Sequence, residues 1–332
     1  MADELSARGV EVVFAGTADR IEARLVPAAG YPLHTFRVKG FTRRPSPALI
    51  EAAALAALAP GTCLRMLRRL RPQVVFGGGF VGGPMFAAAA GLRIPAALFE
   101  VDAHMGLANR LASPVVRRVF LAFPIPGLNP PHHVVTGRPV PKSVLDATRE
   151  QGRAEFGLPS DRQVVVVMGG SLGANSLNMA AVEAWADADP GFTVVNVTGA
   201  HDFPLLARRA SSYYRVIEFT QSLGPLLAAC DLVVSRAGGS VFEIAAAGRP
   251  AILVPSPNVS ADHQTPNAEY LTDGGAAIAM RDAQVTPNRL AHEVAELLAN
   301  PSRLEGMGLA ATRLARPDAA SVIASQLLEM VR

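Results

Sequence analysis

The sequence has few cysteines, few aromatic residues and no long apolar run. Its two cysteines, Cys63 and Cys230, lie far apart, which excludes a disulfide framework and predicts buried thiols in a reducing cytoplasm. The longest apolar stretch, ALIEAAALAALA, contains Glu51 and ends at Pro60, so it is shorter than the ~20 residues that a transmembrane helix needs. Met1 is not followed by a charged and then apolar segment, which argues against export. No set of histidine, cysteine and acidic residues has metal-ligand spacing, so we expect neither a metal nor a cofactor.

What the sequence does have is many apolar residues and an uneven distribution of charge. Half of its 332 residues are hydrophobic and 18% are charged, which suits two domains with sizeable cores. Residues 1–150 hold 18 Arg and Lys against 10 Asp and Glu (net +8), whereas residues 151–332 hold 13 against 18 (net −5). A basic half indicates an anionic partner. Because its basic stretches carry few aromatic residues for base stacking, a lipid head group or a pyrophosphate fits better than nucleic acid.

Apolar, β-branched runs alternate with helical stretches along the whole chain. The runs are EVVFAGT, QVVFGGG, AALFEVD and HHVVTGRPV, then QVVVVMGG, FTVVNVTG, RVIEFT, DLVVSRAGG and PAILVPS. This rhythm predicts an α/β protein with two wound, mostly parallel sheets. A polar, proline-bearing stretch over 136–162 separates the two groups. We therefore predict domains at 1–140 and 141–315, and a closing helix at 316–332.

Two glycine-rich loops follow predicted strands in the second half. In VVVVMGGSLGANSLN, Gly169 and Gly170 permit a tight turn before a helix whose N–H groups could hold a phosphate, with the Ser171 hydroxyl as a further donor. A plain strand–helix turn with Ser171 as N-cap explains this stretch equally well. In DLVVSRAGGSVFEIAAAG, Ser240 and Glu243 have capping-box spacing. That spacing favours a structural role for Glu243 over a carboxylate that accepts the hydroxyls of a ribose.

Three more loops follow strands, where the ligands of wound sheets bind. VSADHQTPNAEYL opens a helix with a cluster of polar side chains, for which surface or capping roles are the simpler explanation; they are Asp262, His263, Gln264 and Asn267. VVFGGGFVGGP surrounds Phe80 with glycines that serve either a ligand or close helix packing. LFEVDAHMGLANR ends a strand with Glu100 and Asp102, which are either an acid–base pair or solvated loop acids.

These stretches together resemble the MurG family of glycosyltransferases (glycosyltransferase family 28). GTADRIEARLVP, GGGFVGGP, GGSLGANSLN, SRAGGSVFEIAAAGRPAILVP and ADHQTPNAEYL come in the family's order over nearly the whole chain. The resemblance implies the GT-B fold, in which two Rossmann-like domains face a cleft. It also implies inverting, metal-independent transfer of N-acetylglucosamine from UDP-N-acetylglucosamine to lipid I, at the cytoplasmic face of the cell membrane. Another UDP-sugar enzyme of this fold, or a truncated non-catalytic UDP-sugar-binding paralogue, is the alternative.

The resemblance also implies roles for individual residues. Glu243 would hold the ribose, the Thr220 backbone would line the uracil pocket, and Gln264 would contact the sugar. The implied donor-side residues are Asp102, Ser171, Thr220, Arg236, Gly238, Gly239, Ser240, Glu243, His263 and Gln264. The implied acceptor-side residues are Gly78, Gly79, Phe80 and Asn109.

Several positions depart from the family's motifs. HEQN reads FEVD here, which puts Phe99 and Asp102 in place of its histidine and asparagine. NPVR reads RPVP at 138–141, GGSQGAR contains Leu172 and Asn175, and the loop between Arg236 and Glu243 is one residue shorter than in many members.

The chain opens on what reads as the end of an amphipathic helix, residues 3–8 with Gly9 as its C-cap. The family begins one strand earlier, with a GGTGGH-like loop whose histidine is a proposed base. We therefore expect the base to lie in a segment that this chain lacks, through a start codon placed too late or a truncation, with Glu100 and Asp102 as fallback candidates. The lost strand would be central, so its neighbours would have unpaired edges.

The arginines of the first half flank apolar stretches. They are Arg43, Arg44, Arg65, Arg68, Arg69 and Arg71 around ALIEAAALAALA, and Arg110, Arg117 and Arg118 around VVRRVFLAFP. This pattern predicts peripheral docking on an anionic membrane surface, against the simpler reading of a solvated basic face.

Overall fold

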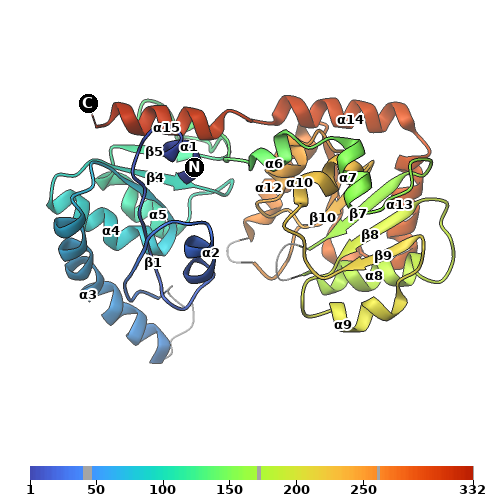
Figure 1. Cartoon of the computed structure of the whole chain (residues 1–332), viewed down its shortest axis with the longest axis horizontal. Coiled ribbons are helices and arrows are strands. Elements are labelled where there is room, and N and C mark those ends of the chain that lie inside the picture. Colours follow the sequence, from blue (N-terminus) through green and yellow to red (C-terminus); the bar gives the residue numbers. More distant parts are fainter. Residues whose placement is uncertain (40–46, 170–172, 260–261, 332) are drawn as a thin grey trace. The chain divides into compact units, whose positions relative to one another are not determined.

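The structure is a computed structural model that describes residues 1–39, 47–169, 173–259 and 262–331. The chain divides into two compact units, Met1–Arg138 with Asp318–Arg332 (unit 1) and Pro139–Pro317 (unit 2) (Figure 1). Every strand pair in the described parts is parallel, and helices connect the strands. The predicted α/β class with wound parallel sheets is confirmed.

Unit 1 contains two parallel sheets, in the orders β1-β2 and β3-β4-β5-β6. The strands are β1 (Phe14–Gly16), β2 (Leu33–Thr35), β3 (Val75–Gly77), β4 (Ala96–Glu100), β5 (Arg118–Leu121) and β6 (His133–Val135). The helices are α1 (Ala2–Ser6), α2 (Glu22–Ala28), α3 (Pro47–Leu70), α4 (Gly79–Gly91), α5 (Leu107–Ala112), the 3-10 turn η1 (Ser113–Val115) and α15 (Ala319–Glu329).

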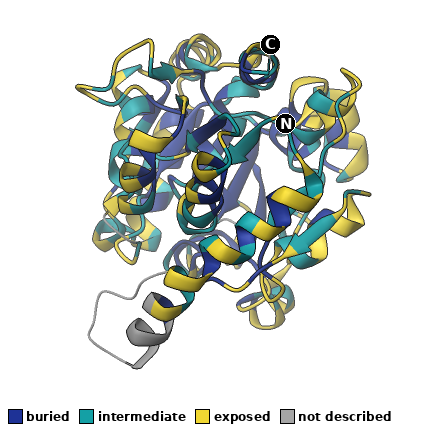
Figure 2. Ribbon diagram, turned by 90° about the vertical axis from the view of Figure 1, so that its left-hand side faces the viewer, coloured by how far each residue is buried: buried dark blue, intermediate teal, exposed yellow. Residues whose placement is uncertain are grey.

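Alternate side chains of β4 and β5 enter two different cores, because successive residues of a strand face opposite sides of the sheet. Leu98 and Val119 pack with buried residues of α3, α4 and α5. Ala97 and Phe120 pack with Ile323 of α15 and with residues of α1. Figure 2 shows these buried strands between helices whose outward faces are exposed. The C-terminal helix therefore belongs to the core of unit 1, where it lies beside α1 (Figure 1).

The sheet of unit 1 is interrupted between β1 and β3. Among the residues that the structure describes, β1 pairs only with β2 and β3 pairs only with β4. The Phe14 and Val75 amides donate to the carbonyl oxygens of Pro32 and Pro95, the residues directly before those partner strands. Because N–H groups alternate in direction along a strand, the Ala15 and Phe76 amides point away from the partners. Both strands are therefore edge strands, and the side chains of β3 are only half-buried despite their apolar sequence.

We expect this interruption to be visible in amide hydrogen exchange. The Phe76 amide should exchange about a thousandfold faster than those of Leu98 and Phe120, because edge amides open locally whereas interior strands open with their core. The Val75 amide, on the same strand but bonded to Pro95, is the matched comparison and should exchange more slowly than that of Phe76. Mass spectrometry or NMR measures this directly. Equal protection of Phe76 and Leu98 would show that another chain segment covers the edge.

Unit 2 contains one six-stranded parallel sheet in the order β12-β11-β10-β7-β8-β9. The strands are β7 (Val164–Met168), β8 (Thr193–Val197), β9 (Tyr214–Ile217), β10 (Leu232–Ser235), β11 (Ala251–Leu253) and β12 (Ala277–Ala279). The helices are α6 (Lys142–Leu145), α7 (Arg149–Glu155), α8 (Asn175–Trp185), α9 (Phe203–Leu206), α10 (Leu223–Ala229), α11 (Val241–Ala246), α12 (Gln264–Asp273), α13 (Pro287–Leu298) and α14 (Pro301–Leu314), with the 3-10 turns η2 (Ala207–Arg209) and η4 (Asp282–Gln284).

The strand order of unit 2 reverses between β7 and β10. The chain runs outward from β7 to β9, returns to the other side of β7 at β10, and then continues outward to β12. Such a switch point opens a crevice at the carboxyl ends of its two strands, where open α/β sheets bind ligands. The two glycine-rich loops singled out in the second half follow these two strands.

Each of the nine predicted apolar runs overlaps a strand, and three strands in the described parts of the chain were not predicted, β2, β5 and β12. Pro60 ends the apolar run in the sequence but not the helix, since α3 continues through Pro60 to Leu70. No helix in the described ranges is both long and apolar enough to cross a membrane. Cys63 and Cys230 are free and buried, as expected, and burial raises the pKa values of their thiols to about 11 and about 12.

Candidate functional site

Gly169 and Gly173, on either side of residues 170–172, have no room for a side chain. A Cβ atom on Gly169 would lie 2.3 Å from the Ala174 amide nitrogen. Gly173 has a φ of +78°, and its Cβ atom would lie 2.3 Å from the Thr198 carbonyl oxygen. Gly173 therefore packs against the end of β8 just before α8 begins. Residues 170–172, including Ser171 and the family departure Leu172, lie outside the described residues.

A buried carboxylate braces the first turn of α8. Asp202, 6% exposed, accepts hydrogen bonds from Asn175 Nδ2 (3.2 Å), Asn178 Nδ2 (2.8 Å) and His201 Nδ1 (2.7 Å). Burial raises the pKa of this carboxyl group, but the three hydrogen bonds outweigh burial and hold the pKa below its usual range. Asn175, one of the departures from the family motif, thus has a defined partner. Nothing in the sequence indicated Asp202, which precedes α9.

The loop after β10 begins level with the loop after β7, because Ser235 is in register with Met168. Arg236 follows, and its guanidinium contacts α8, the segment after β11 and η4. Gly238 and Gly239 lead to Ser240, the N-cap of α11. The Ser240 side chain makes no capping hydrogen bond, so that half of the predicted capping box is wrong. Glu243 lies half-buried in the first turn of α11.

The start of α12 is tied to the same loop. Asn267, fully buried, donates from Nδ2 to the Ala237 carbonyl oxygen (3.2 Å). Gln264 accepts the Ser256 amide at Oε1 (2.8 Å), and its Nε2 lies 3.8 Å from the position of a Cβ atom on Gly238. His263 is the N-cap of α12. The structure therefore brings the 236–243 and 263–267 motifs together at one edge of the sheet.

Thr220 lies further along this edge, between β9 and α10. Its Oγ1 accepts the Ser222 amide (2.9 Å), which fixes the turn, and its neighbour Phe219 is 62% exposed. Because β9 is the outermost strand beyond β8, this turn is two strands away from the β7 loop.

In unit 1, Glu100 is a fully engaged structural carboxylate. It is 2% exposed, and its Oε1 accepts the amides of Val101 (2.9 Å) and Asp102 (3.2 Å). Its Oε2 accepts the Gly106 amide (2.9 Å) and Asn109 Nδ2 (2.8 Å). The geometry therefore favours a structural role over the acid–base role considered for Glu100. Asp102, the other fallback candidate, is half-buried in the loop that Glu100 holds.

Asn109 connects Glu100 to the glycine-rich loop after β3. Its Oδ1 accepts the Gly79 amide (2.7 Å), so both ends of its side-chain amide are bonded within unit 1. A Cβ atom on Gly78 would lie 2.4 Å from the Phe99 carbonyl oxygen, so this loop lies against the end of β4. Phe80 follows, with the Arg20 guanidinium 4.8 Å from its ring centroid.

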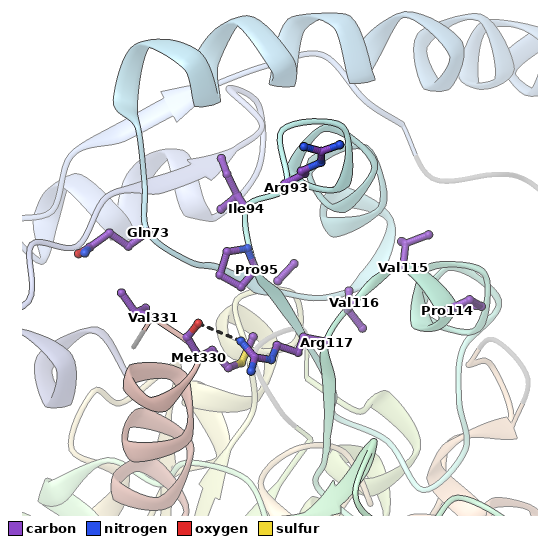
Figure 3. A pocket seen from close by; sticks show the side chains of 11 residues that line it. Gln73, Arg93, Ile94, Pro95, Pro114, Val115, Val116, Arg117, Met330 and Val331 are labelled. Atoms are coloured by element: carbon purple, nitrogen blue, oxygen red, sulfur yellow. Dashed lines mark hydrogen bonds between the residues drawn. The ribbon is translucent and has the colours of Figure 1, made fainter.

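A pocket of about 740 Å³ lies at the opposite edge of the unit 1 sheet (Figure 3). Gln73, Pro95 and Arg117 line it, and each of them comes just before a strand. Because the candidate loops follow strands, this pocket is separate from them. No cluster of three metal-ligating side chains occurs in the described parts of the chain.

Two domain models of one known protein family match this chain, one in each half. The Glycosyltransferase family 28 N-terminal domain matches residues 1–121, and the family's C-terminal domain matches residues 164–323. A protein of Salinibacter ruber named "UDP-N-acetylglucosamine--N-acetylmuramyl-(pentapeptide) pyrophosphoryl-undecaprenol N-acetylglucosamine transferase" is 38% identical, over 96% of this chain and 88% of its own. One of the same name from Rubrobacter xylanophilus is 37% identical, over 99% and 98%.

Among solved structures, MurG of Acinetobacter baumannii superposes with a TM-score of 0.79 and 26% identity, over 99% of this chain and 94% of its own. The UDP-GlcNAc 2-epimerase of Neisseria meningitidis has a TM-score of 0.66 but only 15% identity, over 98% and 94%. The second likeness concerns the fold alone.

Proposed function

The chain belongs to glycosyltransferase family 28, and we propose that it transfers N-acetylglucosamine from UDP-N-acetylglucosamine to lipid I, which yields lipid II for peptidoglycan. The observation that carries this proposal is the convergence of three sequence motifs at the switch point of unit 2. The loops after β7 and β10 follow neighbouring strands there, and Asn267 and Gln264 tie the start of α12 to the loop after β10 and to the segment after β11. The names of the full-length relatives support the choice of donor and acceptor.

Unit 2 holds the donor in this proposal. The loops at 169–174 and 236–240 offer backbone N–H groups to the diphosphate, and the N-terminus of α8 adds a positive potential. Glu243 accepts the ribose hydroxyls, the Thr220 backbone contacts the uracil, and Gln264 contacts the sugar. Because the N–H donors stabilise the leaving UDP, the proposal needs no metal ion.

Unit 1 holds the acceptor, near the loops that contain Gly79, Phe80 and Asp102. A hydroxyl of the acceptor sugar displaces UDP in one step, which inverts the anomeric carbon. A base must accept the hydroxyl proton. Of the two acidic candidates in unit 1, Asp102 is the better one, because all four hydrogen bonds of Glu100 go to its own loop and α5.

A transfer assay with labelled UDP-N-acetylglucosamine and a lipid I analogue tests the function. We expect a labelled lipid II product with lipid I and none with unrelated glycoside acceptors. Release of N-acetylmannosamine without lipid II would instead favour an epimerase, and UDP binding without any turnover would favour a non-catalytic paralogue.

We also propose that unit 1 docks peripherally on the anionic cytoplasmic leaflet. Four large apolar side chains of α3, α5 and η1 are at least half exposed: Leu58, Leu107, Leu111 and Val115. Arg65, Arg68 and Arg110 are exposed on the same helices. Arg117 and Arg118, grouped with them on sequence, bond to Met330 and Gln326 at α15 instead, so we leave them out of this surface. Exposed apolar side chains and exposed arginines on the same helices suit an interface of lipid tails and anionic head groups.

Vesicle co-sedimentation checks this docking. Binding should rise with phosphatidylglycerol content and fall with salt, and Arg110→Ser should weaken it about fivefold, since one surface arginine contributes ~1 kcal/mol. Leu107→Ser with Leu111→Ser should weaken it further. Leu205→Ser and Leu309→Ser, at exposed leucines of unit 2, are the matched controls and should have no effect. Binding that ignores both lipid charge and salt would contradict the proposal.

A further inference from the structure

Asp282 makes contacts that its sequence context does not suggest. It opens η4, just after β12, in the stretch MRDAQVTP, which carries no ligand-binding pattern. Its Oδ1 lies 2.6 Å from Arg236 Nη1 and accepts a hydrogen bond from Ser176 Oγ at 2.7 Å. The Arg236 and Asp282 side chains are only 12% and 23% exposed. These three side chains come from three segments at the carboxyl edge of the sheet.

The Arg236 guanidinium joins the same segments and a fourth. Nη2 donates to Ser176 Oγ (2.7 Å), and Nη1 donates to the carbonyl oxygens of Val254 (3.2 Å) and Pro255 (3.4 Å). Ser176 Oγ thus donates to Asp282 and accepts from Arg236, which closes a three-membered ring of polar contacts. The ring connects the second residue of α8 with the end of β10 and with η4, and Arg236 extends it to the segment after β11.

We propose that Asp282 is a positioning residue for the donor diphosphate. By holding Arg236 and Ser176 together, it fixes the spacing between the loop that precedes α8 and the loop that precedes α11. This inference rests on the proposed donor site. The family resemblance implies only that Arg236 is a donor-side residue. Because the Asp282 carboxylate beside it balances its charge, we assign the guanidinium the role of bracing the loops rather than that of an independent counter-ion for phosphate.

Asp282→Asn distinguishes between these two roles of Arg236, because it keeps the shape of the residue 282 side chain and removes its charge. If Arg236 braces the loops, the weakened contact lets them move apart and UDP binds less tightly. If Arg236 serves as a counter-ion, loss of the opposing charge leaves the guanidinium more positive and UDP binds more tightly. The sign of the change in UDP affinity therefore decides between them.

Titration calorimetry with UDP is the experiment, on the full chain. We expect Asp282→Asn to raise the Kd for UDP about tenfold, the scale of one charge-assisted hydrogen bond, and Ser176→Ala about threefold. Asp282→Asn combined with Arg236→Lys should have less than the product of the single effects, because both disturb one network. Asp189→Asn is the matched control, since Asp189 pairs with Arg162 before β8, at the opposite edge of the sheet.

Two further measurements distinguish a positioning role of Asp282 from a purely structural one. In the transfer assay, the KM for UDP-N-acetylglucosamine should rise in Asp282→Asn with little change in kcat, whereas a purely structural role would lower Tm and leave the Kd for UDP unchanged. Calorimetry does not depend on the acceptor, so failure of transfer would overturn the proposed function and leave this inference testable. Unchanged or tighter UDP binding by Asp282→Asn and by Ser176→Ala would overturn it.

Discussion

Glu243→Ala is expected to weaken UDP binding by about 1.5–3 kcal/mol, roughly 10- to 150-fold, the range for hydrogen bonds to a charged group. Glu243 lies in the first turn of α11, directly after the loop at the switch point, where a ribose attached to a bound diphosphate would lie. A carboxylate there can accept both ribose hydroxyls. Removing it leaves those hydroxyls without acceptors in a site from which the ligand has displaced water.

The alternative role of Glu243, as part of a helix cap, predicts a different result. Loss of a cap costs stability, typically ~1 kcal/mol, and leaves the affinity of the folded protein for UDP unchanged. Glu243→Gln retains a hydrogen-bonding side chain at the helix start but should still lose affinity, because the charge is gone. Glu269→Ala, at an exposed glutamate of α12, is the control for a change of net charge. Wild-type UDP affinity in both Glu243 variants would make the residue purely structural.

The sequence predicted the strands, loops and helices of this site, but it did not predict the polar contacts between them. A strand, a glycine-rich loop and a helix can be recognised within 15 residues, since the loop needs glycine where Gly173 passes the Thr198 carbonyl. Asp282 and Ser176 are 106 residues apart, and each has an unremarkable local context. Asp202 likewise acts on α8 from the far end of β8. Such long-range polar partners depend on the sheet order, which local patterns do not contain.

The strands that were not predicted have equally physical explanations. β12 consists of Ala277, Ile278 and Ala279, with one β-branched residue and no apolar run long enough to be recognised, and it forms a strand by pairing with β11. β5 begins at Arg118, whose charge suggested a membrane-facing stretch, yet the Arg118 side chain bonds to Gln326. In both cases contacts with other elements, rather than the strand propensity of the residues, determine that the segment forms a strand.

Glu100→Gln is expected to destabilise unit 1 by about 3 kcal/mol and to lower its Tm by about 6–12 °C. Both oxygens of Glu100 accept two N–H groups each, so either orientation of a glutamine amide places an NH₂ group against two donors. Those donors lose their acceptor in a site that is 2% exposed, where an unsatisfied polar group costs ~1–3 kcal/mol. UDP affinity should change little, because unit 2 has its own sheet and core.

Asp102→Asn is the matched comparison and should show the opposite pattern. Asp102 is half-buried whereas Glu100 is 2% exposed, so replacement of Asp102 by an isosteric amide should lower stability by less than Glu100→Gln does. If Asp102 is the base, transfer to lipid I should fall by ~10²–10⁴, the contribution of general base catalysis, while UDP binding is retained. Differential scanning calorimetry and the transfer assay on both variants separate a structural from a catalytic carboxylate. A Glu100→Gln protein with wild-type Tm and a hundredfold loss of transfer would reverse the assignment, because the four hydrogen bonds would then contribute little to folding and the carboxylate would act on the reaction itself.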